Sequence, residues 1–253
     1  MMAEGRASGR LRLRVASYNT HRSVGTDRRC RPERVARVIR ELDADIVGLQ
    51  EVDWKAATGP GAASQAEFLA HLQGYTAIEG PNLLDHRGHY GNMLLTRFPL
   101  RRLERARLRT SRREPRGLID AELDCHGVAL RVLVTHLGLG LRERCVQAAQ
   151  LARRVARTPE LPTLLLGDLN DWMIGHPTIR PLIDAADAAS PPPRSFPARW
   201  PLFALDRVMG WRLAGSLRAQ VHRSPEARAA SDHLPVVCEV ALAGNGGHAM
   251  PGT

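Results

Sequence analysis

The chain has 253 residues, 43% of them hydrophobic, which is enough to bury the core of one large domain or two small ones. No segment approaches the ~20 consecutive apolar residues of a membrane-spanning helix. The first ten residues are polar and lack the apolar run of a secretory signal. The net charge of +10 favours anionic partners in general.

Neither the basic residues nor the cysteines point to a specific partner. Lys55 is the only lysine among the 36 basic residues, which indicates a compositional bias of the coding DNA as much as a binding face. The cysteines lie far apart and form no Cys-x-x-Cys pair: Cys30, Cys125, Cys145 and Cys238. They predict free thiols in a reducing cytoplasm and argue against a zinc site.

Strands and helices are predicted to alternate in the first part of the chain. Leu11, Leu13 and Val15 alternate with arginines, which is typical of a strand. Pro32 opens a helix whose apolar residues recur at helical spacing. The elements predicted here are a strand from 11 that ends in the polar residues 17–21, a helix from 32 to 42, a strand at 45–49, a Gly/Ala-rich loop at 56–63 and a short helix at 64–72.

A run of consecutive strands follows, and then further helices and strands. The predicted elements are strands at 90–98, 100–108, 117–124 and 128–135, a helix at 141–157, a strand at 163–166, a helix near 176–186, a Pro-rich segment at 191–201, and strands at 205–209, 216–222 and 234–242. Two sheets packed face to face with helices outside accommodate this order. We therefore expect one domain over residues 11–242, with a flexible N-terminal tail at 1–10 and a disordered C-terminal tail at 243–253.

One buried strand ends in two polar side chains of chemical interest. An apolar run at 164–166 stops at Gly167, and Asp168 and Asn170 follow two residues apart, so that on an extended chain they point the same way. An aspartate there can accept a proton from water, and an asparagine can orient a nucleophile or hold an oxyanion. Both residue types are also common in turns, so the segment alone leaves both interpretations open.

Other predicted strands end in similar groups. They present carboxylates, histidines and an asparagine: Asn19, Glu51, His136, Asp206, Asp232 and His233. Each has an ordinary explanation as a turn, cap or surface residue. Their repetition at strand ends favours a joint site, because α/β sheets commonly place their chemistry there.

Phosphate ester hydrolysis needs this set of side chains. Charge on the phosphoryl oxygens has to be neutralised, a water activated and a leaving oxygen stabilised. Oxygen ligands such as Glu51 and Asp232, without thiolates, suit Mg²⁺ or Mn²⁺ better than zinc. His233 can stabilise charge on the phosphate if a carboxylate fixes its orientation, and Asp206 is the candidate.

Taken together, these residues resemble the endonuclease/exonuclease/phosphatase superfamily, which is DNase I-like, and in particular its compact bacterial members. The matching segments run from about residue 11 to 242, in the order found in the family: Ser17-Tyr18-Asn19-Thr20-His21, Leu49-Gln50-Glu51-Val52, Tyr90-Gly91-Asn92, Thr135-His136-Leu137, Gly167-Asp168-Leu169-Asn170, Leu205-Asp206-Arg207-Val208 and Ser231-Asp232-His233-Leu234-Pro235. Gly-Asp-x-Asn or Ser-Asp-His alone is moderate evidence, and the ordered set is strong evidence.

The resemblance implies an α/β fold: a four-layer α/β/β/α sandwich of two mixed, mostly antiparallel sheets flanked by helices. It implies that Glu51 is the main metal ligand, with Asn19 and Asp232 near a Mg²⁺ or Mn²⁺ ion, and that Asp168 activates water. The remaining implied roles are Asn170 beside Asp168, His136 facing the phosphate or leaving group, the Asp206–His233 pair, and Arg116 with Asn92 at the substrate phosphate.

The resemblance specifies the reaction better than the substrate. We expect a divalent-metal-dependent phosphodiesterase acting on a phospholipid head group or another small phosphodiester, slightly ahead of a nuclease acting on DNA or RNA. A catalytically inactive nucleic-acid-binding module is the third alternative. A cytoplasmic monomer is expected, without a transmembrane segment and compatible with peripheral membrane contact. The segment at 191–201 either lines the site or is a rigid connection, and Trp172 either touches substrate or packs on a helix.

Overall fold

The computed structural model of the protein describes residues 10–54, 64–81, 90–110, 113–173, 175–189 and 191–244. Its strands are β1 (Arg10–Asn19), β2 (Ile46–Asp53), β3 (Thr76–Pro81), β4 (Tyr90–Thr96), β5 (Leu100–Thr110), β6 (Arg113–Cys125), β7 (Val128–His136), β8 (Thr163–Asp168), β9 (Ala188–Ala189), β10 (Asp206–Trp211), β11 (Arg218–Val221) and β12 (Val236–Ala243). Its helices are the 3-10 turn η1 (His21–Ser23), α1 (Pro32–Leu42), α2 (Gln65–Ala70), α3 (Leu141–Val155), α4 (Arg180–Ala185) and α5 (Pro225–Ala230).

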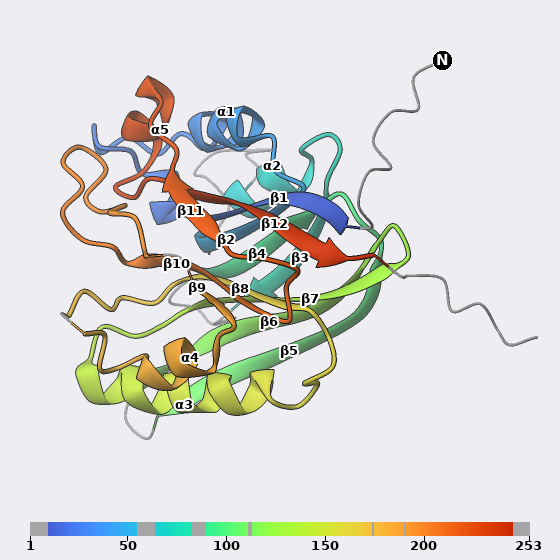
Figure 1. Ribbon diagram of the computed structural model, residues 1–253. Helices are drawn as coiled ribbons and strands as arrows, with labels where there is room; N and C mark the ends of the chain where they lie inside the picture. Colours follow the sequence, from blue (N-terminus) through green and yellow to red (C-terminus); the bar gives the residue numbers. More distant parts are fainter. Residues whose placement is uncertain are drawn as a thin grey trace, which may run out of the picture.

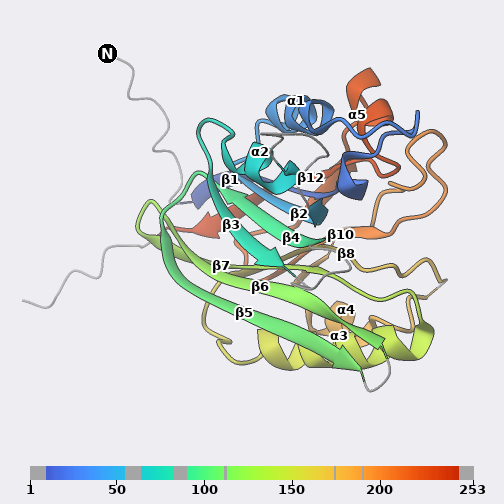
Figure 2. The same cartoon turned by 180° about the vertical axis from the view of Figure 1, so that it is seen from behind.

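The described strands form two six-stranded sheets. Their orders are β11-β12-β1-β2-β4-β3 and β5-β6-β7-β8-β10-β9. The pairs β1–β2 and β7–β8 are parallel, and the other described pairs are antiparallel. Helices α1, α2 and α5 cover the outer face of the first sheet, and α3 and α4 cover that of the second (Figures 1 and 2). The predicted four-layer sandwich of mixed, mostly antiparallel sheets is confirmed.

Three hydrophobic clusters separate the four layers. The central cluster lies between the sheets and includes Val15, Val134 and Leu166. A second packs the first sheet against its helices, and a third packs the second sheet against α3 and α4. The sheets approach closely at Gly48, where an added Cβ would lie 2.8 Å from the Leu166 Cβ, so no larger side chain fits there without moving the sheets apart.

Local sequence explains most of these elements. Pro32 begins α1 at its first position, where proline has no hydrogen bond to lose, and one face of this helix is fully buried. β8 is buried along its whole length, because it is an inner strand covered on both faces. None of the helices in the described ranges has the length and apolar composition needed to cross a membrane.

The sequence prediction missed or misplaced several short elements. β3, β9 and α5 were not predicted, and α4 is shorter than the helix expected near 176–186. Short elements carry too few periods for a pattern to emerge, although Ser224 before Pro225 caps α5 by accepting a hydrogen bond from Ala227 N. Arg10 and Ala243 belong to strands rather than tails; apart from these two and Gly244, the predicted tails and the loop at 56–63 lie outside the described residues.

A buried ion network holds α3 against the second sheet. Arg131 donates to both carboxylate oxygens of Asp120 at 2.8 Å, and Arg154 Nε donates to Asp120 Oδ2 at 2.7 Å. Burial alone would raise the pKa of Asp120, but the hydrogen bonds and charges of the two arginines outweigh it, so the pKa lies below its usual value. This carboxylate therefore stabilises the fold above its unfolded pKa, and the stabilisation is lost as the pH falls through the folded value.

Replacing Asp120 with asparagine is expected to lower the free energy of unfolding at neutral pH by ~3 kcal/mol, because two buried guanidinium groups lose their counter-charge. Urea unfolding followed by circular dichroism measures this. The Asp124→Asn variant is the control: Asp124 pairs with Arg101 at the surface, so its unfolding curve is expected to stay close to wild type. Equal curves for the two variants would contradict the assigned role of the network.

Candidate active site

Strand ends from both sheets meet at one end of the sandwich. β1 ends at Asn19, and Glu51 follows directly on the residue of β2 that pairs with it. In the second sheet, β7 ends at His136 and β8 ends at Asp168, and these two residues are register partners. β10 begins at Asp206, which also pairs with Asp168. The topology therefore collects the predicted strand-end residues in one place.

The backbone is irregular at two of these residues. The pairing register between β2 and β4 shifts between Leu49 and Val52, and Glu51, inside this bulge, has a φ of 55°. Asn170 has a φ of 51°. A left-handed conformation costs a non-glycine residue on the order of 1 kcal/mol, and such residues cluster at functional sites. Here the unusual backbone sets the direction of both side chains.

Asp168 joins the two sheets at the centre of the site. Its Oδ2 accepts a hydrogen bond from Asn19 Nδ2 at 3.0 Å, and its Oδ1 accepts one from Asn170 N at 2.9 Å. Asn19 Nδ2 also donates to Glu51 Oε1 at 3.1 Å. Burial alone would raise the pKa of Asp168, but the charge of the His233 imidazolium and these hydrogen bonds outweigh it and lower the pKa. Asp168 is therefore ionised.

His136 is neutral, with its proton on Nδ1. Its Nε2 lies 2.9 Å from Asn170 Nδ2, which also donates to the Leu137 carbonyl oxygen at 2.9 Å. Because the amide nitrogen is the donor, Nε2 is the acceptor, and Nδ1–H faces Glu51 Oε1 at 3.9 Å. Burial lowers the pKa of His136 and outweighs the opposing effect of the Asp168 carboxylate.

His233 is charged, because it is paired with Asp206. Its Nδ1 lies 2.9 Å from Asp206 Oδ2, and Ser195 Oγ donates to the same oxygen at 2.5 Å. Burial alone would lower the pKa of His233, but the Asp206 and Asp168 carboxylates outweigh it and raise the pKa to about 10. Burial also raises the pKa of Asp206. We place the proton on His233, because an oxygen that accepts two hydrogen bonds behaves as a carboxylate.

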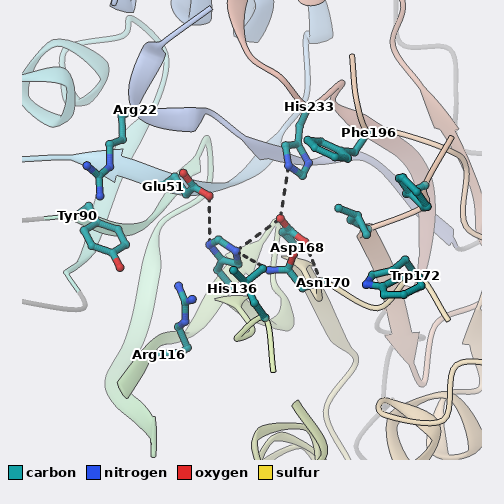
Figure 3. Close-up of a pocket in the computed structure, with 13 residues that line it drawn as sticks. Arg22, Glu51, Tyr90, Arg116, His136, Asp168, Asn170, Trp172, Phe196 and His233 are labelled. Atoms are coloured by element: carbon teal, nitrogen blue, oxygen red, sulfur yellow. Dashed lines mark hydrogen bonds and ion pairs between the residues drawn. The ribbon is translucent and has the colours of Figure 1, made fainter. Parts of the chain in front are cut away.

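These groups open onto a cavity of about 520 Å³. In Figure 3, Arg22, Tyr90 and Arg116 lie on one side of the catalytic groups, and Phe196 and Trp172 lie on the other. The cavity is lined by Arg22, Glu51, Tyr90, Arg116, His136, Leu139, Asp168, Asn170, Trp172, Phe196, Phe203, Leu205 and His233. A cationic side and an apolar side therefore flank the polar centre.

Most of the predicted site residues come together here. The predicted residues that line the cavity are Glu51, Arg116, His136, Asp168, Asn170 and His233. Asp206 lies behind His233 and is fully buried, and Asn19 is buried between the carboxylates that it bridges. The Nε atom of Arg116 is buried and has no hydrogen-bond partner within the described part of the chain. At least one N–H group of this guanidinium is therefore not used to hold the fold.

Besides Asn19 and Asp206, two further predicted residues do not line the cavity. Asn92 is fully buried, and its amide donates to the Gly117 carbonyl oxygen at 2.9 Å. It therefore faces the backbone of β6 next to Arg116 instead of a bound phosphate. The Asp232 Oδ1 atom lies 3.5 Å from His21 Nδ1, beside the site and in contact with η1.

Several lining residues were not predicted. They are mostly apolar or come from loops: Arg22, Tyr90, Leu139, Phe196, Phe203 and Leu205. The Arg22 guanidinium stacks 4.7 Å above the Tyr90 ring. Phe196 belongs to the Pro-rich segment, so of the two interpretations of that segment the structure supports the one in which it lines the site. Trp172 also lines the cavity and is 60% exposed.

The donor set at the centre fits a hard divalent cation. The Glu51 carboxylate is 26% exposed in the cavity and offers oxygen ligands, and no thiol is among the lining residues. Asp168, Asp206 and His233 also bring ligand atoms within 4.8 Å of one another, but the last two use theirs in a mutual hydrogen bond. Asn19 presents its amide nitrogen, not its oxygen, to Glu51. Glu51 is thus the carboxylate best placed to hold a metal.

Sequence comparison points to one family. The profile of the Endonuclease/Exonuclease/phosphatase family matches residues 16–233. The protein YbhP of Escherichia coli strain K12 is 31% identical over 245 residues, which cover 91% of this chain and 96% of YbhP. The profile match spans the whole set of strand-end residues described above.

Solved structures show the same fold. An endonuclease/exonuclease/phosphatase from Beutenbergia cavernae superposes with a TM-score of 0.74 at 24% identity, covering 92% of this chain and 72% of its own. A mannosyl-6-phosphatase from Bacteroides thetaiotaomicron superposes with a TM-score of 0.72 at 20% identity, covering 90% of this chain and 99% of its own. At these identities the likeness concerns the fold.

Proposed function

The chain belongs to the endonuclease/exonuclease/phosphatase family, a family of phosphoester hydrolases, and we propose that it is a divalent-metal-dependent phosphodiesterase. Its substrate is a phospholipid head group or another small phosphodiester. One observation carries this proposal: the Asp168 carboxylate lies 3.6 Å from His136 Nε2 and 3.7 Å from His233 Nε2, and all three side chains face one cavity with Glu51 beside them. The pKa of Asp168 is lowered and that of His233 is raised, and groups with opposite protonation states in one site are typical of acid–base catalysis.

Asp168 is the base in this proposal. Its carboxylate is fixed by Asn19 and Asn170, so it can orient a water molecule for in-line attack and accept its proton. The same carboxylate lies 3.6 Å from His136 Nε2 and 3.7 Å from His233 Nε2. A phosphoryl group bound over these three side chains is within reach of both the attacking water and the cationic imidazole of His233.

The other side chains stabilise charge. The His233 imidazolium, oriented by Asp206, faces the phosphoryl oxygens, and Asn170 and His136 are placed beside it. Glu51 would hold Mg²⁺ or Mn²⁺, with Asn19 and Asp232 near it, and the bound ion would neutralise phosphoryl charge. Arg116 binds the phosphate from the opposite side of the cavity, and Asn92 fixes the backbone next to it.

Metal dependence is the direct test of this reaction. The purified protein is expected to hydrolyse bis(p-nitrophenyl) phosphate with Mg²⁺ or Mn²⁺ and to lose that activity in EDTA, because the cation that Glu51 would hold neutralises charge on the substrate. Release of p-nitrophenolate is measured, and adding back the metal after EDTA is the control. Turnover that persists in EDTA would contradict the proposal.

A substrate panel separates the alternatives. It contains phospholipid vesicles, inositol phosphates, plasmid DNA, RNA and, because a similar structure is named a mannosyl-6-phosphatase, a sugar phosphate monoester. Cleavage of nucleic acid alone would make the enzyme a nuclease, and binding of nucleic acid without cleavage of any substrate would indicate an inactive module.

We also propose that the protein acts as a cytoplasmic monomer. The four cysteines are free, and two of them are buried, which is typical of a protein in a reducing compartment.

A further inference from the structure

Several large apolar side chains that line the cavity, or lie in the hairpin that carries Phe203, are exposed to solvent. We call this group the apolar rim, and its members with their exposed fractions are Leu139 (73%), Trp172 (60%), Trp200 (73%), Leu202 (60%) and Phe203 (42%). Two of the four tryptophans of the chain belong to it. Contiguous exposed apolar groups of this kind mark interaction surfaces.

The rim is held rigidly in place. Phe196 and Phe203 exchange backbone hydrogen bonds of 3.0 and 2.8 Å, and Trp200 N donates to the Pro197 carbonyl oxygen at 3.0 Å. The loop of this hairpin is bonded to the segment before β12, because Ala198 N donates to the Asp232 carbonyl oxygen. Hydrogen bonds thus hold the backbone that carries the exposed side chains of Trp200 and Leu202.

The rim is continuous with the catalytic centre. The rings of Trp172 and Phe203 meet edge to face, with centroids 6.3 Å apart, and Leu139, Trp172 and Phe203 also line the cavity. Further in, the ring of Phe196 lies 4.8 Å from the imidazole of His233. An apolar path therefore leads from the surface to the histidine that faces the phosphate, on the side of the cavity that carries Trp172 and Phe196 in Figure 3.

Exposed arginines lie close to the rim residues in the chain. Arg194 and Arg199 are exposed on the same segment as Trp200, and Arg142 is exposed near Leu139. Exposed tryptophan and leucine beside arginine is the composition of protein segments that lie in the interface of an anionic membrane. Single-stranded nucleic acid would use aromatic faces for base stacking, but Leu139 and Leu202 offer no such face, so the rim fits lipid better.

We propose that the apolar rim inserts into the surface of an anionic phospholipid bilayer, and that the phosphodiester substrate is a phospholipid of that bilayer. The acyl chains follow the path past Trp172, Phe203 and Phe196, and the head group enters between Arg116 and Arg22. The choice of substrate rests on the phosphodiesterase activity proposed above, whereas insertion does not depend on catalysis.

Vesicle sedimentation tests insertion. The wild-type protein is expected to sediment with phosphatidylglycerol vesicles about tenfold more than with phosphatidylcholine vesicles, since each arginine near an anionic surface adds attraction. The double variant Trp200→Ala, Leu202→Ser is expected to bind the anionic vesicles at least tenfold more weakly. The matched control is Leu100→Ser, which removes an exposed leucine (39% exposed) at the opposite end of the second sheet, and it is expected to bind like wild type.

Activity distinguishes failure of this inference from failure of the proposed function. Trp200 and Leu202 do not line the cavity, so the double variant is expected to hydrolyse soluble bis(p-nitrophenyl) phosphate at the wild-type rate while its hydrolysis of vesicle phospholipid falls at least tenfold. Three results would overturn the inference. The wild-type protein does not bind anionic vesicles, the rim binds single-stranded DNA instead, or the double substitution leaves vesicle binding unchanged. Absence of soluble turnover in wild type overturns the proposed function, while sedimentation still tests the rim.

Discussion

Replacing Asp168 with asparagine is expected to lower kcat for bis(p-nitrophenyl) phosphate by ~10³-fold, because the substitution removes the base and leaves its shape. The amide oxygen of the new side chain can still accept the hydrogen bond that Asn19 donates to Oδ2 at 3.0 Å, whereas the amide nitrogen cannot accept the one that Asn170 N donates to Oδ1 at 2.9 Å. The change therefore removes the negative charge, the ability to accept a proton and one hydrogen bond. KM is expected to change much less than kcat, since the lost interaction is made in the transition state.

Single-turnover and steady-state rates of the Asp168→Asn protein measure this effect, and near-UV circular dichroism verifies its fold. Asp184→Asn is the matched control, since it makes the same chemical change on the exposed side of α4, where Asp184 pairs with Arg180. A rate within tenfold of wild type for the Asp168 variant would show that another group activates the water, and the assignment of the base would be wrong.

The sequence predicted the fold and most of the catalytic centre, because both depend on how strands end. Asp168 and His136 each follow a continuous apolar run, and such a run in an inner strand ends where the chain reaches the edge of the sheet. Once two sheets are expected, residues at their strand ends have one common place to meet. The register partners His136 and Asp168 are the direct outcome of this rule.

The directions of side chains near the ends of strands could not be predicted in this way. Asn92 lies in β4, where the sequence places it, but its side chain bonds to Gly117 across to the second sheet. Glu51 points into the cavity because of a bulge and a positive φ, which the apolar pattern of β2 does not contain. The orientation of a side chain at a strand end depends on one or two backbone angles, and period-2 alternation carries no information about them.

The apolar side of the cavity was the largest omission. Phe196 and Phe203 lie in a hairpin with an isolated bridge rather than a regular strand, so no periodicity marks them. Ser195, which fixes the carboxylate of Asp206, is also in this hairpin. The sequence indicated its place only through the alternative in which the segment at 191–201 lines the site. The position of a loop that is held by long-range contacts can be assigned only from the tertiary structure.

The two histidines show how one cavity separates two roles. Both are buried, yet the pKa of His136 is lowered and that of His233 is raised to about 10. The difference comes from their partners: an amide nitrogen faces His136, whereas a carboxylate accepts from His233. Asp206 therefore decides whether this cavity presents a positive charge to the phosphate.

Asp206→Asn is accordingly expected to lower kcat at pH 8 by ~10²-fold or more and to move the alkaline limb of the pH–rate profile to lower pH. In wild type the folded pKa of His233 lies above its unfolded value, so the imidazolium persists until the pH rises through about 10. Without the carboxylate, burial lowers this pKa and the charge is lost earlier. Ser195→Ala is the comparison, since it removes one hydrogen bond to Asp206 and keeps the charge; the limb should barely move. An unchanged limb in Asp206→Asn would mean that the charge of His233 does not support catalysis, and that the pair serves only to hold the loop before β12.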